Sequence, residues 1–223
     1  MRTVIAGGHG KIARRLERLL AARGDEAVGL IRNPAQADAL RAAGAEPAVC
    51  DLESATVGEV ARHLEGADAA VFAAGAGPGS GAARKETMDL GGAVLFADAA
   101  ELAGVRRFVI VSSIGADREP PPGTDPVFAA YLRAKSAADA DIRSRTGRLS
   151  WTVLRPGGLT DEPGTGLVTL AESTERGSIS RDDVAAVLLA LLDTPATTGL
   201  SLDLVAGPTA IPRAVTEVAG VAG

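Results

Sequence analysis

The sequence predicts a doubly wound α/β fold, a parallel sheet with helices on both faces, as a single domain over residues 1–223. Short Val- and Ile-rich runs alternate with Ala- and Leu-rich helical stretches along the whole chain. With 223 residues and 46% hydrophobic content, the chain can bury one full core. Aromatic residues make up only 3%, so the core must be packed from small side chains, as between closely apposed helices and strands.

The first half of the chain consists of strand–helix units punctuated by glycine. Gly24 and Gly44 follow helical stretches, where glycine commonly ends a helix. The fourth strand leads into a glycine-rich loop, Gly75–Gly81. The expected strands are Thr3–Ala6, Ala27–Ile31, Glu46–Cys50 and Ala69–Ala73, and the expected helices are Lys11–Arg23, Ala35–Ala43 and Thr56–Leu64.

The second half of the chain continues this alternation. Three prolines within Gly115–Asp125 make that segment a loop, and Ser180, with Asp183 three residues later, fits the N-terminal cap of a helix that reaches Leu192. Strict alternation predicts parallel pairing throughout, with ligands bound outside the carboxyl ends of the strands. The other expected elements are the helices Glu86–Ala103 and Phe128–Arg145 and the strands Arg107–Ser112, Trp151–Arg155 and Leu202–Val205, the last followed by a short tail.

Charge and composition exclude several classes of protein. The net charge is −5 with acids and bases interspersed, whereas proteins that bind nucleic acids or membrane surfaces usually carry a basic face. One cysteine, Cys50, excludes an internal disulfide, and the two histidines match no metal-ligand spacing, so no metal site is expected. A strand begins directly after Met-Arg-Thr and no apolar run approaches ~18 residues, so we expect a cytoplasmic protein without a signal peptide or membrane span.

A glycine-rich segment lies between the first strand and the first helix. Gly7 would permit a tight turn, Gly10 a close approach of the backbone to a pyrophosphate, and Ala13 close packing of helix on strand. The free N–H groups at the helix N-terminus favour phosphate. Any sharp strand-to-helix turn favours glycine, but its place in the first strand–helix unit favours a dinucleotide site. The candidate cofactor-binding residues of this segment are therefore Gly7, Gly8, His9, Gly10, Lys11 and Ile12, although an exposed loop histidine also explains His9.

The ends of the next three expected strands fit the adenosine half of such a site. Arg32 stands where NAD-preferring sites usually carry an acid, and its guanidinium suits the 2′-phosphate of NADP, so NADPH is expected in preference to NADH. A solvated surface arginine is the alternative. Asp51 could accept from adenine while Leu52 packs on the ring, although an aspartate that caps the next turn explains Asp51 equally well. Ala73-Ala74-Gly75 would let the fourth strand end close to the cofactor.

The candidate catalytic residues are Tyr131 and Lys135, which lie four apart on a predicted helix and therefore on one face of it. Lys135 could stabilise the Tyr131 phenolate and reach the nicotinamide ribose, which would make Tyr131 a general acid–base in carbonyl reduction or alcohol oxidation. Ser113 could hold the substrate oxygen, with Ser112 beside the cofactor. The alternative is a packed tyrosine and a solvated lysine. The three lysines of the chain, all expected at one cleft, are Lys11, Lys85 and Lys135.

Together these residues resemble the short-chain dehydrogenase/reductase superfamily, specifically its small atypical NAD(P)-binding branch with NmrA-like and biliverdin or flavin reductase-like proteins. The segments Val109-Ile110-Val111-Ser112-Ser113 and Leu154-Arg155-Pro156-Gly157-Gly158-Leu159 also carry the resemblance. The latter segment is similar to the Arg-Pro-Gly turn of the family, which implies that Pro156, Gly157, Gly158 and Leu159 border the nicotinamide. Asp89 lies near a position where other members carry an active-site asparagine.

The resemblance implies an NADP-dependent oxidoreductase that transfers hydride between NADPH and a small carbonyl, quinone or flavin-like acceptor. The alternative is a non-catalytic NADP(H)-binding redox sensor or regulatory protein. About 40 residues separate Leu159 from the last expected strand, so neither a large C-terminal substrate lobe nor sugar-nucleotide epimerase activity is expected. The expected partners are a nicotinamide dinucleotide and a small-molecule acceptor, without nucleic acid or membrane, in a monomer or homodimer.

Overall fold

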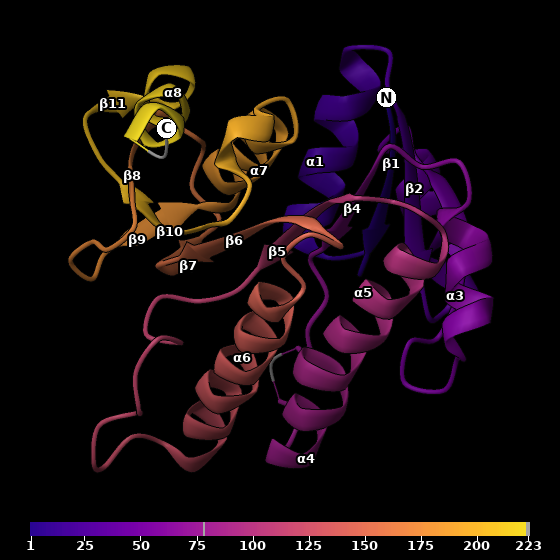
Figure 1. Ribbon diagram of the computed structural model, residues 1–223, viewed down its shortest axis with the longest axis horizontal. Coiled ribbons are helices and arrows are strands. Elements are labelled where there is room, and N and C mark those ends of the chain that lie inside the picture. Colours follow the sequence, from indigo (N-terminus) through magenta and orange to yellow (C-terminus); the bar gives the residue numbers. More distant parts are fainter. Residues whose placement is uncertain (78, 222–223) are drawn as a thin grey trace.

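The prediction of a doubly wound α/β fold is confirmed. The computed structural model describes residues 1–77 and 79–221, and these residues form a nine-stranded sheet with helices on both faces (Figure 1). Residue 78, within the expected loop Gly75–Gly81, and the last two residues of the expected domain lie outside the described residues. From edge to edge the strands are β11 (Thr209–Ala210), β8 (Leu167–Ala171), β10 (Leu200–Ala206), β6 (Ser150–Pro156), β5 (Arg107–Val111), β4 (Ala69–Phe72), β1 (Arg2–Ala6), β2 (Glu26–Ile31) and β3 (Glu46–Val49).

The strands from β10 to β3 pair in parallel, and their order places β1 between β2 and β4. Val4 of β1 lies opposite Val28 on one side and Ala70 on the other. Because the winding of the chain reverses between β1 and β4, the connections after these two strands leave in opposite directions. A crevice for a ligand is expected at this point of the sheet.

The helices of the described residues are α1 (Lys11–Ala22), α2 (Ala37–Arg41), α3 (Val57–Leu64), α4 (Ala82–Arg84), α5 (Gly92–Leu102), α6 (Pro126–Ser144), α7 (Arg181–Leu192) and α8 (Ile211–Val221). Helices α1, α7 and α8 cover one face of the sheet, and α3, α5 and α6 cover the other (Figure 1). On the second face the rings of Phe72, Phe96 and Phe108 lie in a row, with centroids 6.1 and 5.8 Å apart. These rings fill space that the surrounding alanines leave open.

The central strands are apolar on both sides because both sides are covered. In β1, Val4 belongs to the hydrophobic cluster under α3 and α5, whereas its neighbour Ile5 belongs to the cluster under α1 and α7. Val109 and Ile110 of β5 divide between the clusters in the same way. Such strands appear in a sequence as continuous apolar runs, and this is why their positions could be predicted closely.

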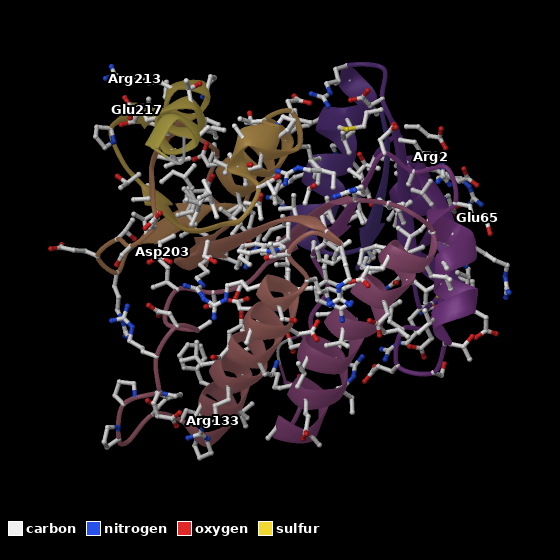
Figure 2. The ribbon with its side chains drawn as sticks, viewed as in Figure 1. Arg2, Glu65, Arg133, Asp203, Arg213 and Glu217 are labelled. Atoms are coloured by element: carbon white, nitrogen blue, oxygen red, sulfur yellow. The ribbon has the colours of Figure 1, made fainter. Side chains whose placement is uncertain are left out.

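Charged side chains lie mainly at the surface, where they fasten neighbouring elements (Figure 2). Arg2 at the start of β1 donates to the Glu65 carbonyl at 2.9 Å, just after α3. Arg213 and Glu217 form an ion pair of 2.7 Å along α8. Within the described residues, no helix is both long enough and apolar enough to cross a membrane.

The prediction that all strands pair in parallel is wrong at one edge of the sheet. Strand β8 is antiparallel to β10, and β11 is antiparallel to β8. A separate two-stranded pair, β7 (Gly158–Thr160) with β9 (Ser178–Ser180), precedes α7. In the described part of the chain, no helix lies between β6 and β8, so no crossover from β6 sets the direction of β8, and α7 joins β8 to β10 as an antiparallel pair.

The prediction of a short tail after the last strand is also wrong, because Ile211–Val221 forms helix α8. Ile211, Ala214 and Val215 are buried at the spacing expected for one face of a helix, and they pack in the same cluster as α7. Pro212 stands in the first turn, where proline is well tolerated. A helical pattern is therefore present in the sequence of this segment, short as it is.

The single long helix expected over Glu86–Ala103 is instead two segments of different helical type. Helix α4 leads into a π-helical stretch, Lys85–Gly91, and this leads into α5. The wider π turn brings Lys85 and Asp89 into the interior together. Gly91 ends the π-helical stretch and Gly92 begins α5, and both are poor helix formers. π turns of this kind occur frequently at functional sites.

Candidate functional site

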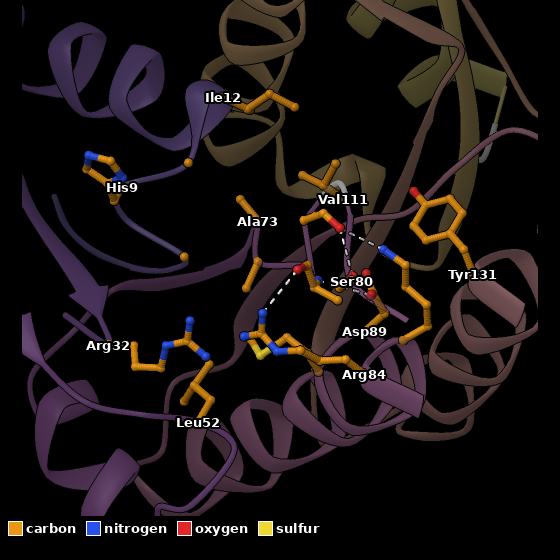
Figure 3. Close-up of a pocket in the computed structure, with 18 of the residues that line it drawn as sticks. His9, Ile12, Arg32, Leu52, Ala73, Ser80, Arg84, Asp89, Val111 and Tyr131 are labelled. Carbon is orange, nitrogen blue, oxygen red and sulfur yellow. Dashed lines mark hydrogen bonds between the residues drawn. The ribbon is translucent and has the colours of Figure 1, made fainter. Parts of the chain in front are cut away.

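A cleft of about 1100 Å³ runs along the carboxyl ends of the central strands (Figure 3). Its lining includes the residues that follow five consecutive strands of the sheet, β3, β2, β1, β4 and β5. This is the edge at which doubly wound sheets bind ligands. The residues that follow these strands in the lining are Cys50, Arg32, Gly7, Ala73 and Ser112.

The glycine-rich loop forms the floor of the cleft between β1 and β4. Gly7 has φ of +79°, and a Cβ atom there would lie 2.6 Å from the Cα of Ala74, so only glycine fits. The N–H of Gly10 donates to the Gly7 carbonyl at 2.7 Å, which closes the turn. Among the described residues, no side chain caps the start of α1 at Gly10. The first N–H groups of α1 are therefore available to an anion in the cleft.

At one end of the cleft, which we call the arginine end, Arg32, Glu53 and Arg84 meet. Glu53 Oε2 accepts hydrogen bonds from Arg32 Nη1 at 3.2 Å and from Arg84 Nη2 at 2.6 Å. The hydrogen bonds from Arg84 hold the pKa of Glu53 below its usual value. Asp51 caps the turn between β3 and Glu53, because its Oδ1 accepts from the Glu53 N–H at 3.1 Å. Asp51 therefore has the turn-capping role that the sequence offered as the alternative to adenine binding.

At the other end, which we call the tyrosine end, a buried ion pair joins α6 to the π-helical stretch. Lys135 Nζ lies 3.4 Å from Asp89 Oδ1 and donates to the Val111 carbonyl at 3.1 Å. The two side chains are only 3% and 1% exposed. Asp89 Oδ2 also accepts the Ala76 N–H at 3.1 Å, so one carboxylate fixes both Lys135 and the loop after β4. The amine of Lys135 is thereby held in a single position in the cleft wall.

Tyr131 lies one helical turn before Lys135 and faces the same cleft. Its ring centroid is 5.9 Å from Lys135 Nζ and 5.6 Å from Lys85 Nζ, so two ammonium groups lie near one aromatic ring. Phe128 stacks on the ring with centroids 5.8 Å apart. The Tyr131 hydroxyl is directed to the side of the cleft where Ile12 and Val111 lie (Figure 3). A phenol placed in this way can exchange a proton with a ligand in the cleft.

A second buried ion pair lies behind the tyrosine end. Asp139, one turn beyond Lys135 on α6, accepts a 2.9 Å hydrogen bond from Arg155 Nε of β6. Burial raises the pKa of Asp139, and the positive charge of Arg155 offsets part of this rise. Ser112 lines the cleft from the end of β5, with its hydroxyl oxygen buried. These groups form a polar layer beneath the tyrosine end.

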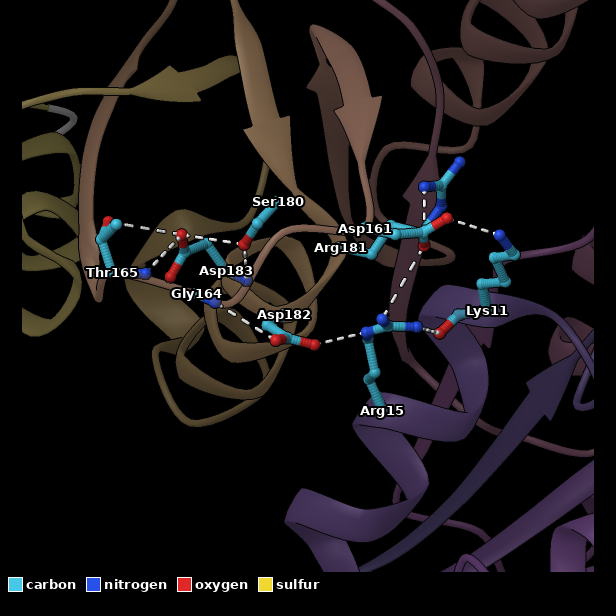
Figure 4. A network of polar contacts seen from close by, with 9 residues as sticks. All are labelled: Lys11, Arg15, Asp161, Gly164, Thr165, Ser180, Arg181, Asp182 and Asp183. Carbon is cyan, nitrogen blue, oxygen red and sulfur yellow. Dashed lines mark hydrogen bonds and ion pairs between the residues drawn. The ribbon is translucent and has the colours of Figure 1, made fainter.

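Along the rim of the cleft, Asp161 gathers three cationic side chains (Figure 4). Lys11 Nζ lies 2.5 Å from Asp161 Oδ2, and Arg181 Nη1 lies 2.9 Å from Oδ1. Arg15 pairs with both Asp161 and Asp182. Lys11 and Arg181 also line the cleft, so both can meet a negatively charged ligand beside the glycine-rich loop.

Most of the residues predicted for the site come together in this cleft. All three lysines line it, as the sequence suggested. Within residues 1–77 and 79–221 there is no group of three His, Cys, Asp or Glu side chains that could hold a metal ion. The predicted residues that line the cleft are Gly7, His9, Gly10, Lys11, Ile12, Arg32, Asp51, Leu52, Ala73, Ala74, Gly75, Ser112, Tyr131, Lys135 and Leu159.

The other predicted residues lie beside the cleft rather than in its lining. A Cβ on Gly8 would lie 2.7 Å from the Cα of Gly29, so Gly8 packs the loop onto β2. The Ser113 hydroxyl donates to the Ile114 carbonyl at 3.3 Å. Pro156, Gly157 and Gly158 also lie outside the lining. Gly157 and Gly158 pack against the loop before β9.

Sequence reasoning missed cleft residues from the turn after β3, from α4 and from the first turns of α6 and α7. Glu53, Arg84, Phe128 and Arg181 all line the cleft. Arg181 follows the predicted cap Ser180, so its place at the start of a helix at the sheet edge was a usable signal. Glu53 and Arg84 are 31 residues apart, and no local pattern indicates that they meet.

Comparisons with known proteins identify a family for this chain. A family model described as NAD(P)H-binding matches residues 7–195. A protein of Bacillus subtilis (strain 168), named an uncharacterized sugar epimerase, is 37% identical over 220 residues, which span 98% of this chain and 100% of that protein. The match covers both chains almost completely, so the likeness extends over the whole fold.

Two solved structures show the same likeness in three dimensions. One, from Bacillus halodurans and provisionally assigned as an NAD-dependent epimerase/dehydratase, has 36% identity and a TM-score of 0.88 over 97% of this chain and 99% of its own. The other, the anaerobillin reductase ChuY of Escherichia coli O157:H7, has 25% identity and a TM-score of 0.78 over 92% and 97%.

Proposed function

Because this chain belongs to the NAD(P)H-binding family, an atypical branch of the short-chain dehydrogenases/reductases, we propose that it transfers hydride between NADPH and a small carbonyl, quinone or flavin-like acceptor. The match to the family and the likeness to a reductase both support NAD(P)-dependent oxidoreduction. The observation that carries the proposal is the pairing of Tyr131 with the buried amine of Lys135 in the wall of the cleft.

The glycine-rich loop fits a dinucleotide. Side chains at Gly7 and Gly10 would fill the cradle between β1 and β4, since a Cβ at Gly10 would lie 2.9 Å from the Gly7 carbonyl oxygen. The pyrophosphate would be held by the N–H groups at the start of α1, with Lys11 and Arg181 supplying positive charge. When bound, the reduced nicotinamide supplies the hydride. The loop Ala73-Ala74-Gly75 would lie against the ligand on the β4 side.

The preference for NADPH over NADH is proposed from Arg32. No acid follows β2 at the position where NAD-binding sites hold the ribose 2′-hydroxyl, and Arg32 stands there with its side chain in the cleft lining. A guanidinium can bind a 2′-phosphate through two parallel hydrogen bonds. We expect Arg32→Ala to weaken NADPH binding at least tenfold more than NADH binding, measured by fluorescence titration. An equal loss for both cofactors would remove the 2′-phosphate argument.

Tyr131 is proposed as the general acid in the reductive direction. Its Oη would donate a proton to the acceptor oxygen as the hydride reaches the adjacent carbon, and Lys135 would stabilise the resulting phenolate through its positive charge. Lys135 can do so repeatedly because Asp89 and the Val111 carbonyl hold its amine in place. Ser112 or Ser113 would orient the acceptor oxygen, and of the two Ser112 lines the cleft.

Reduction is proposed rather than sugar epimerisation. In the described residues, the segment between β6 and β10 adds only three short strands, α7 and a 3₁₀ turn at Pro195–Thr197, and these leave little protein to enclose a sugar nucleotide. Pro156, Gly157 and Gly158 would support the nicotinamide end from behind, with Leu159 at its rim. The cytoplasmic location and the monomeric or homodimeric state stay predictions, as does action without nucleic-acid or membrane partners.

A non-catalytic NADP(H) sensor is the second candidate, and one observation favours it. The Lys135 amine is directed to Asp89 and Val111, and lies 5.9 Å from the Tyr131 ring centroid. This arrangement would also serve to brace α6 against the sheet. A sensor would bind NADPH as an enzyme does but would reduce no acceptor.

The variant Tyr131→Phe separates the two functions because it keeps the ring that stacks on Phe128 and removes only the hydroxyl. NADPH oxidation would be followed with an aldehyde, a benzoquinone and riboflavin. We expect kcat to fall about 10²- to 10⁴-fold while the Kd for NADPH stays unchanged. Unchanged turnover would rule out proton donation by Tyr131. Tight NADPH binding by the wild-type protein without oxidation by any acceptor would favour the sensor.

A further inference from the structure

At the arginine end, two guanidinium groups converge on a single carboxylate oxygen. Glu53 Oε2 lies 3.2 Å from Arg32 Nη1, 3.0 Å from Arg84 Nε and 2.6 Å from Arg84 Nη2. All three side chains line the cleft. The position of Oε2 therefore marks a point where one anionic oxygen receives hydrogen bonds from both arginines.

The surrounding structure holds Glu53 and Arg84 at this point. Thr87 donates to Glu53 Oε1 at 2.8 Å, and Arg84 Nη1 donates to the Ala76 carbonyl at 3.2 Å. Arg84 is thereby fixed to the loop after β4, which forms the cleft floor beside Gly75. Arg32, in contrast, has a side chain that is 56% exposed and a single 3.2 Å contact with Glu53. One guanidinium is anchored and the other can turn toward a ligand.

The charges of this cluster do not cancel. Two guanidinium groups face one carboxylate, and the lowered pKa of Glu53 keeps that carboxylate ionised at neutral pH. The cluster thus carries a net positive charge, which suits a doubly charged phosphate monoester. The carboxylate would compete with such a phosphate for the same N–H groups.

We propose that Arg84 is a second specificity-determining residue for the cofactor 2′-phosphate, and that Glu53 is a built-in competitor that limits how strongly the phosphate is preferred. This inference rests on the proposed NADPH function. A 2′-phosphate oxygen would displace Glu53 Oε2, or lie beside it, and so receive hydrogen bonds from both arginines. NADH carries a neutral 2′-hydroxyl in place of the phosphate, so Glu53 would keep both arginines when NADH is bound.

The two roles predict opposite effects for two substitutions that each remove one charge. Arg84→Gln removes a charge-assisted donor, so NADPH binding should weaken about 10- to 100-fold while NADH binding changes less than threefold. Glu53→Gln removes the competing charge, so NADPH binding should tighten about threefold to tenfold with NADH again almost unchanged. If the ion pair served only to hold the fold, Glu53→Gln would weaken the binding of both cofactors.

The measurement is a fluorescence titration of each folded variant with NADPH and NADH, repeated with 2′-phospho-AMP and 5′-AMP to isolate the adenosine half. Thr87→Val is the matched control, because it removes an uncharged donor to Glu53 and leaves every charge in place. We expect it to shift both cofactors equally and by less than threefold. Circular dichroism and melting temperature would establish that each variant is folded.

The outcomes separate this inference from the proposed function. Loss of NADPH preference in Arg32→Ala, with no selective loss in Arg84→Gln, would overturn the role of Arg84 and leave the Arg32 site intact. Weaker NADPH binding by Glu53→Gln would overturn the competition. If Arg84→Gln fails to fold, Glu53→Gln still decides, because its expected sign is opposite to that of a structural role. Absence of any NADPH binding by the wild-type protein would contradict the proposed function itself.

Discussion

The two ends of the cleft each contain an ion pair of almost the same length in very different surroundings. Lys135 and Asp89 at the tyrosine end are 3.4 Å apart, and Arg32 and Glu53 at the arginine end are 3.2 Å apart. The first pair is 3% and 1% exposed, whereas the second is 56% and 20% exposed. Distance alone would rank the two pairs as equal. Their burial makes them different in stability and in function.

The difference matches what each end is proposed to do. A buried pair holds its groups in one geometry, which suits chemistry that must recur at fixed positions. An exposed pair is screened by water and salt and exchanges partners easily, which suits a surface that must accept and release a phosphate. The comparison therefore predicts that substitutions at the tyrosine end change stability, whereas those at the arginine end change affinity.

The largest expected effect is that of Lys135→Met. Methionine keeps much of the side-chain volume but leaves the Asp89 carboxylate buried without its cation. Removing one partner of a buried pair typically costs about 3–5 kcal/mol, so we expect that loss in the free energy of unfolding from urea denaturation. Oxidoreductase activity should be lost as well. A loss below about 1 kcal/mol would show that the pair is not isolated from water.

The double variant Lys135→Met/Asp89→Asn is the control for this result. Asparagine removes the uncompensated charge and retains an oxygen that can accept the Ala76 N–H. Most of the lost stability should therefore return, without return of activity, because the amine near Tyr131 is still missing. A double variant as unstable as the single one would mean that packing around Lys135, rather than charge, accounts for the loss.

A buried carboxyl on α1, that of Glu17, forms no ion pair within the described residues, in contrast to Asp89. Glu17 of α1 packs against Gly29 of β2, and within the described residues neither of its carboxyl oxygens has a hydrogen-bond partner. Burial raises the pKa of Glu17 to about 8. Between pH 4.5, where the unfolded chain loses this proton, and pH 8, the folded protein retains it, so the contribution of Glu17 to stability falls as pH rises.

Glu17→Gln should remove this pH dependence, because glutamine stays neutral at every pH. At pH 4 the variant and the wild type should unfold with almost the same free energy. At pH 8 the variant should be more stable by about 4 kcal/mol, on the scale of about 1.36 kcal/mol for each unit of pKa shift. Urea denaturation at pH 4, 6 and 8 measures the difference. Parallel curves for the two proteins would show that Glu17 is ionised in the folded state.

The same contrast explains which parts of the site could be predicted from the sequence. Tyr131 and Lys135 are four apart on a helix, and Gly7 and Gly10 lie in one turn, so their spacing alone places them together. Glu53 and Arg84 meet only because the turn after β3 and helix α4 are folded onto the same cleft. Asp89 can be singled out from the sequence, but the π-helical turn that brings it to Lys135 has no local signature there.

The fold shows the same division between local and non-local information. Central strands such as β1 and β5 are covered on both faces, and their continuous apolar runs reveal them. Strand β8 is short, lies near an edge and pairs with β10 across about 30 residues, so its direction depends on contacts that no local pattern encodes. Helix α8 is different, because Ile211, Ala214 and Val215 have helical spacing in the sequence. This helix was therefore predictable from local information, although it was not predicted.

The smallest effect expected on stability is that of Arg32→Ala, and it tests the comparison most directly. The pair it breaks is as short as the one broken by Lys135→Met, but exposed side chains lose little through desolvation and gain little from pairing. We therefore expect the free energy of unfolding to fall by less than about 1 kcal/mol under identical urea conditions, while NADPH affinity falls strongly. Glu53 would keep its contact with Arg84, so no charge is left unpaired. A loss of stability equal to that of Lys135→Met would mean that burial is not what distinguishes the two ends of the cleft.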